Sequence, residues 1–143
     1  MLLQINNINL EIDKIINESC GKSYSFIQRI IKSNYGSNRY QLLNISTNKY
    51  NIELYKYNDS IYLNFDLRDR GIVFYFRYLN TEYVEFCPYN LLTFQSSNYS
   101  FVIQTDKNIY SFKILKLKDH KKFIKKIYVF KSNLKSLSEE TLE

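Results

Sequence analysis

The chain has 143 residues, of which 45% are hydrophobic and 24% are charged, a composition typical of one globular domain with a single core. Three Gly, one Pro and a 17% aromatic content argue against flexible linkers, collagen-like repeats and disorder. The formal net charge of +6 is uneven: it is +1 over residues 1–112, +8 over residues 113–135 and −3 over residues 136–143. Any contact with a polyanion is therefore expected to pass through residues 113–135.

The composition also bears on compartment and source. The first residues lack the basic start and apolar stretch of a signal peptide, and no run approaches the ~20 apolar residues of a membrane span. Cys20 and Cys87 do not suggest a secreted disulfide framework, so we expect two buried thiols. The absence of Ala and the abundance of Ile, Asn, Lys and Tyr are typical of an A+T-rich coding sequence. We predict a cytoplasmic protein of bacterial origin.

Two short amphipathic helices are predicted within residues 1–39. Asn9 is positioned to cap a helix over residues 10–20 that Gly21 ends, and Ser23 to cap a second helix over residues 24–33. Helices this short are marginal in water, so their apolar sides need a partner surface. We expect them to cover a sheet of their own chain; the alternative is a sheet of a second copy. Their apolar residues are Ile12, Ile15, Ile16, Ile27, Ile30 and Ile31.

From Tyr40 onward the hydrophobic pattern alternates with a period of two. The clearest case is residues 61–67, where Ile61, Leu63, Phe65 and Leu67 share one face. Short polar turns separate the segments, which predicts an antiparallel meander of seven or eight strands forming a bent sheet or a partly open barrel. The predicted strands are residues 40–46, 50–57, 61–67, 72–78, 82–87, 91–95, 99–105 and 109–115. Residues 82–95 are alternatively one strand bent at Pro88.

A closing amphipathic helix is predicted from about Asp119 to about Lys131. Phe123, Ile127 and Phe130 share one side of this helix, and we expect them to be buried against the sheet. Residues 132–143 are expected to be a frayed tail of the same single domain. The candidate anion-binding residues are Lys118, Lys121, Lys122, Lys125 and Lys126. They suit phosphates of nucleic acid or of an anionic membrane; a merely solvated helix face is the alternative.

This order of elements resembles that of pleckstrin-homology-like (PH-like) domains. Residues 86–92, Phe-Cys-Pro-Tyr-Asn-Leu-Leu, are similar to the apolar-apolar-Pro-Tyr step of bacterial members, and residues 99–113 to their final hairpin. The resemblance covers residues 40–131. It implies an α+β fold in which the closing helix plugs an open end of a bent sheet, and a non-enzymatic binding module. The turn of residues 46–50 offers one lysine where inositol-lipid-binding members carry a basic pattern.

No constellation of residues predicts catalysis, a metal or a cofactor. His120 is the only histidine and lies among lysines, so we expect it to be solvated. Cys87 precedes a proline in an apolar strand, which favours a buried thiol over a nucleophile. Asp66 and Asp69 flank a turn and are expected to be turn-formers. We therefore predict that the protein is not an enzyme and that it has no cofactor.

Two classes of binding function remain open from the sequence. The first is an interaction module that binds a protein partner or a second copy of the chain. The second is anion binding through the lysines of the closing helix. A row of tyrosines offers either a stacking platform or cross-strand pairs that stabilise the sheet. These tyrosines are Tyr55, Tyr57, Tyr62 and Tyr75.

Overall fold

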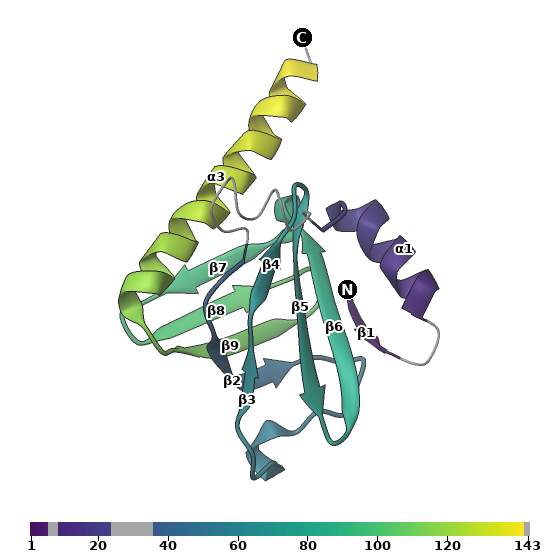
Figure 1. Cartoon of the computed structure of the whole chain (residues 1–143), viewed down its shortest axis with the longest axis vertical. Helices are drawn as coiled ribbons and strands as arrows, with labels where there is room; N and C mark the ends of the chain where they lie inside the picture. The colour runs from purple at the N-terminus through teal and green to yellow at the C-terminus, as the bar shows by residue number, and fades with distance from the viewer. Residues whose placement is uncertain (6–8, 24–35, 142–143) are drawn as a thin grey trace.

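The computed structural model describes residues 1–5, 9–23 and 36–141. In this part of the chain the fold is α+β, with two antiparallel sheets and two helices (Figure 1). The four-stranded sheet has the order β1-β6-β5-β4, and the five-stranded sheet has the order β3-β2-β9-β8-β7. The strands are β1 (Leu2–Gln4), β2 (Tyr40–Ser46), β3 (Ile61–Leu63), β4 (Phe65–Leu67), β5 (Gly71–Tyr78), β6 (Thr81–Pro88), β7 (Thr93–Ser96), β8 (Ser100–Gln104) and β9 (Ile109–Ile114). The helices are α1 (Asn9–Cys20) and α3 (Leu117–Thr141), with single 3₁₀ turns η1 (Leu54–Lys56) and η2 (Tyr89–Leu91).

Every segment predicted as a strand from its alternation contains a strand except residues 50–57, while β1 was not predicted. Residues 50–57 hold η1 instead of a strand. β2 is already paired with β3 and with β9, so it leaves no edge for a further strand. The alternation within residues 50–57 has another cause, which is the packing of its tyrosines. The ring centroid of Tyr50 lies 5.2 Å from that of Tyr83, and the ring centroid of Tyr57 lies 5.3 Å from that of Tyr78. The segment is held by aromatic side chains rather than by a strand ladder.

Residues 61–67 keep their predicted alternation but belong to both sheets. Ile61, Leu63, Phe65 and Leu67 are all buried, as expected. The backbone nevertheless changes partner at Asn64, because β3 pairs with β2 and β4 pairs with β5. The α+β class and the antiparallel strands are confirmed, but the described strands form two sheets that do not close into a barrel, rather than one bent sheet.

Aromatic side chains fill the space between the two sheets. Phe65 of the four-stranded sheet lies at the centre, fully buried. Its ring centroid is 5.0–6.0 Å from five other rings, most of them edge-to-face, a geometry that adds about 0.5–1.5 kcal/mol per pair beyond area burial. These rings belong to Tyr40, Phe74, Phe101, Phe112 and Phe123. The core thus joins both sheets and α3 in one cluster.

The first predicted helix is confirmed, and it packs on the outer face of the four-stranded sheet. Ile16 and Cys20 are fully buried there against Val73, Val84 and Phe86, which form a second, smaller core. α1 thereby covers a sheet of its own chain, as the apolar pattern predicted. Ile15 departs from the expectation and is 42% exposed. The second predicted helix, residues 24–33, lies outside the described residues.

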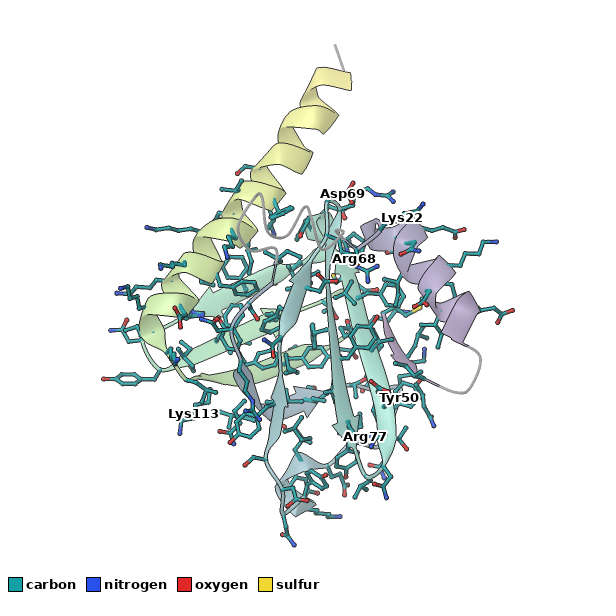
Figure 2. All side chains as sticks on the ribbon, in the orientation of Figure 1. Lys22, Tyr50, Arg68, Asp69, Arg77 and Lys113 are labelled. Carbon is teal, nitrogen blue, oxygen red and sulfur yellow. The ribbon has the colours of Figure 1, made fainter. Side chains whose placement is uncertain are left out.

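The end of α1 is held by a buried arginine, Arg68. Gly21 has φ +91° and its N–H donates to the Asn17 carbonyl at 3.0 Å, so it ends the helix as predicted. Arg68 is 7% exposed, and its guanidinium donates to the Gly21 carbonyl at 3.1 Å and to Asn17 Oδ1 at 3.0 Å. Figure 2 shows Arg68 and Asp69 beside Lys22 at this end of the molecule. A cation at the negative end of the helix dipole anchors α1 to the β4–β5 turn.

The closing helix is longer than predicted. Phe123 and Ile127 are buried as expected, whereas Phe130 is partly buried against Tyr89. α3 begins before Asp119 and continues through Thr141, so the expected frayed tail is wrong up to that residue. Figure 1 shows this C-terminal part projecting past both sheets. No Gly or Pro follows Pro88, and a helix nucleated on the core extends at little further cost.

Candidate functional site

The lysine face of α3 is the outer surface formed by Lys118, Lys121, Lys122, Lys125 and Lys126. Four of these side chains are exposed and Lys126 is partly buried. Their spacing of three and four residues gathers them on the side of the helix opposite Ile127, which is fully buried. Within the described residues none of the five forms an ion pair. The structure thus brings the predicted lysines together on one open surface.

The lysine face occupies about the first three turns of α3. In the first turn the cation of Lys118 is offset by the carboxylate of Asp119, and the effect of the helix dipole is small beyond that turn. Burial lowers the pKa of Lys126, and the neighbouring charge of Lys122 lowers it further. Lysines three and four residues apart repel one another, which weakens the helix, and together they attract anions. Lys131 differs, because its ammonium donates to the carbonyl of Leu92, the residue that follows η2.

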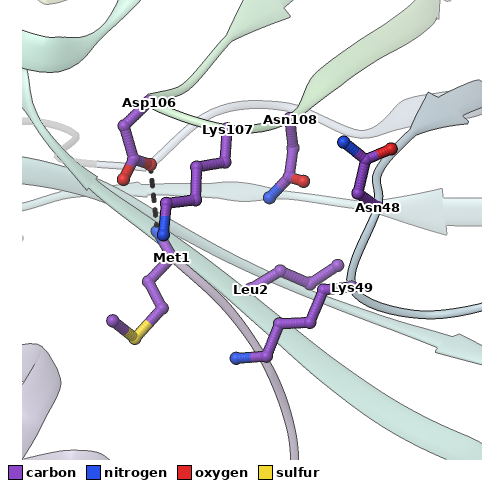
Figure 3. Close-up of a pocket in the computed structure, with 7 residues that line it drawn as sticks. All are labelled: Met1, Leu2, Asn48, Lys49, Asp106, Lys107 and Asn108. Atoms are coloured by element: carbon purple, nitrogen blue, oxygen red, sulfur yellow. Dashed lines mark ion pairs between the residues drawn. The ribbon is translucent and has the colours of Figure 1, made fainter.

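A hollow of about 480 Å³ lies where β1 meets the turn after β2 and the turn between β8 and β9 (Figure 3). It is lined by Met1, Leu2, Asn48, Lys49, Asp106, Lys107 and Asn108. Two exposed lysines belong to it, Lys49 and Lys107, while the Asp106 carboxylate is 3.6 Å from the Met1 amino group. The sequence showed one lysine in this turn. Only the tertiary fold adds the second, because residues 49 and 107 are far apart in the chain.

A buried carboxylate lies behind this hollow. Glu85 is fully buried, and its Oε2 accepts hydrogen bonds from Tyr110 at 2.9 Å and from Asn108 at 3.3 Å. Its Oε1 lies 3.4 Å from the Met1 amino group. Burial raises the pKa of Glu85 above its ordinary value. Both oxygens of the Glu85 carboxyl group are thus engaged in contacts. These contacts join β6, β9 and the β8–β9 turn.

His120 is buried, which corrects the expectation of a solvated side chain. It is 3% exposed and lies between two sheet residues: Nδ1 is 2.6 Å from the Tyr40 hydroxyl, and Nε2 is 2.6 Å from Ser96 Oγ. Burial lowers the pKa of His120, so the ring is neutral at pH 7. In some enzymes a histidine acts as the base that activates a neighbouring serine as nucleophile. His120 and Ser96 have the residue types for that arrangement.

The protons of this cluster argue against that chemistry. Burial raises the pKa of the Tyr40 phenol, so it keeps its proton, and within the described residues its hydrogen-bond partner is His120. A buried hydroxyl without an acceptor is costly, so Tyr40 donates to Nδ1. Nε2 then carries the hydrogen and donates to Ser96 Oγ, which in turn donates to the Ser97 carbonyl. In this tautomer His120 cannot take a proton from Ser96; it ties the start of α3 to β2 and β7.

The two thiols are buried, as predicted. Both Cys20 and Cys87 are free and fully buried. Burial raises the pKa of Cys20, and it raises the pKa of Cys87 to about 12. Neither thiol is ionised at neutral pH, and the thiolate is the reactive form.

The four candidate tyrosines do not form one platform. Tyr55 is 81% exposed on η1, whereas Tyr57 packs on Tyr78. Tyr62 belongs to the five-stranded sheet, where the Arg39 guanidinium lies 4.0 Å from its ring centroid. Tyr75 belongs to the other sheet. Because these side chains are divided between the segment around η1 and two sheets, they do not offer a joint stacking surface.

In residues 1–5, 9–23 and 36–141, no group of three or more His, Cys, Asp or Glu side chains could hold a metal ion. Asp66, one of the two turn carboxylates, pairs with Arg68 at 3.2 Å. No helix in the same residues has the length and apolar character needed to cross a bilayer.

Comparisons of the chain with known protein families, with curated proteins and with solved structures find no match.

Proposed function

We propose that this chain is a non-enzymatic binding module of PH-like type. The PH-like proposal is supported by the order of elements from Tyr40: strand segments joined by short turns, then a helix whose Phe123 enters the core between the sheets. The non-enzymatic part is supported by the buried thiols, the enclosed carboxyl group of Glu85 and the tautomer of His120. Each of these groups has a structural role.

The binding surface best supported by the geometry is the lysine face of α3, and its ligand is a polyanion that carries phosphate groups. One observation carries this proposal: the five lysines share one outward surface without ion partners among the described residues. Stability does not explain this arrangement, since lysines three and four residues apart on one helix repel one another. Attraction for phosphate does.

The test compares two double variants with equal net charge. Lys122→Gln/Lys125→Gln removes two charges from the lysine face, and Lys14→Gln/Lys22→Gln removes two exposed lysines elsewhere. Binding of the wild-type protein to heparin, a generic polyanion, is measured between about 50 and 200 mM salt and should weaken steeply over that range. The first variant should bind several-fold more weakly and with a shallower salt dependence, while the second stays near wild type.

Equal losses in the two variants would show that net charge alone attracts heparin and would contradict the proposal. A protein partner or self-association is the alternative function. Association with either would persist at high salt, because an apolar interface is not screened by ions. Sedimentation of the protein alone at low and high salt distinguishes self-association from polyanion binding.

A further inference from the structure

Resting on this proposed function, we propose that the polyanion bound by the lysine face is the surface of an anionic lipid bilayer. The observation that carries the inference is the pair of residues that follow the lysines on the outside of α3. Tyr128 is 58% exposed and Val129 is 57% exposed. Both are large apolar side chains in contact with water on a helix whose other side is already buried in the core.

The helical spacing aligns each of these apolar residues with lysines. Lys118, Lys122, Lys125 and Val129 are spaced by four, three and four residues, so they form one stripe along the helix. Tyr128 continues a second stripe, three residues after Lys125. The first stripe spans about 16 Å at 1.5 Å per residue. Each stripe therefore joins a basic section to an exposed apolar end.

A lipid interface uses both kinds of side chain. Ammonium groups attract anionic headgroups, while an aliphatic side chain and a tyrosine ring enter the boundary between headgroups and acyl chains. The Tyr128 ring contacts Phe94 with centroids 5.2 Å apart, which holds it in place on the surface of the body. The lysine face is convex, because it is the outside of a helix laid against a sheet core, so it suits a flat surface rather than a small ligand.

Nucleic acid fits the same face less well. The lysines alone do not separate the two ligands, because ammonium groups contact the phosphates of a duplex and of lipid headgroups alike. The exposed Val129 does separate them. An exposed valine gains nothing from a phosphate backbone. Lysines with an apolar end therefore favour a bilayer over a duplex.

The experiment measures binding of the full chain to three probes: phosphatidylcholine vesicles, vesicles with about one third phosphatidylglycerol, and a random duplex DNA. The wild-type protein should bind the anionic vesicles and leave the zwitterionic ones free. Val129→Ser should weaken binding to anionic vesicles about tenfold, and Val129→Leu should strengthen it about fourfold. Each charge removed in Lys122→Gln/Lys125→Gln should weaken it about fivefold. Because these side chains are exposed or lie at the surface, unfolding temperatures should stay near wild type.

The outcomes separate the lipid inference from the proposed function. Binding to DNA and to anionic vesicles that is insensitive to Val129 substitutions would overturn the lipid inference and leave polyanion binding standing. Binding to DNA without binding to vesicles would do the same. Failure to bind vesicles, DNA and heparin would overturn both. Opposite responses of vesicle binding to Val129→Ser and Val129→Leu, with DNA binding unchanged, would support the lipid interface.

Discussion

Phe123→Ala should unfold the protein more readily than any change on the outer side of α3. The side chain is 2% exposed, and its ring stacks on Phe65 with centroids 5.3 Å apart and an interplanar angle of 15°. It also lies 5.9 Å from Tyr40 and 6.4 Å from Phe101, so it touches both sheets. Removing a buried phenyl ring leaves a cavity in a core of rigid rings that cannot collapse to fill it. We expect a loss of about 3–5 kcal/mol in the free energy of unfolding, or about 6–20 °C in Tm.

Urea unfolding followed by circular dichroism measures this loss, with two variants on the same helix as references. Val129→Ala, on the exposed side, should change the free energy of unfolding by less than about 0.5 kcal/mol. Phe130→Ala should cost less than Phe123→Ala, because Phe130 is only partly buried against Tyr89. The reasoning is refuted if Phe123→Ala costs no more than Val129→Ala, since α3 would then not contribute to the core.

Three further predictions concern buried groups. Because burial lowers the pKa of His120 in the folded state, the unfolded state takes up the proton first, so stability should be full above pH ~6.5 and fall as the pH drops below it. The raised pKa of Glu85 makes stability depend on pH in the opposite direction. The contribution of His120 is therefore obtained as the difference between the free energies of unfolding of wild type and His120→Gln at each pH. A difference that does not change with pH would contradict the prediction. Gly21→Ala should lower the free energy of unfolding by more than about 1 kcal/mol, because φ is +91° and an added Cβ would lie 1.8 Å from the Asp69 carboxylate. Thermal melts measure this loss, and a variant as stable as wild type would rule out this contact. Cys20 and Cys87 should resist iodoacetamide at pH 8 until the protein is unfolded in urea, and rapid labelling of the native protein would show that they are not buried as described.

Local residue patterns were enough to predict most elements of the fold. Helix α1 and its end at Gly21 follow from a 3.6-residue apolar period and a residue that tolerates positive φ. The strands follow from alternation, which depends only on which side of the pleat a residue faces. The lysines of α3 were identified for the same reason, since their common side is fixed by helical spacing within one element.

Contacts between distant segments decided the rest. β1 has three residues, too few for a period to show, and it exists because β6 offers an open edge. Asn64 sends one alternating segment into two sheets, and the pattern of burial is the same in either arrangement. His120 lies among lysines in the sequence, yet it is buried because its partners come from β2 and β7. The sequence by itself determined the periodicity of each element and the positions of its charges. Only the tertiary structure decided which polar groups contact one another, because these contacts join residues far apart in the chain.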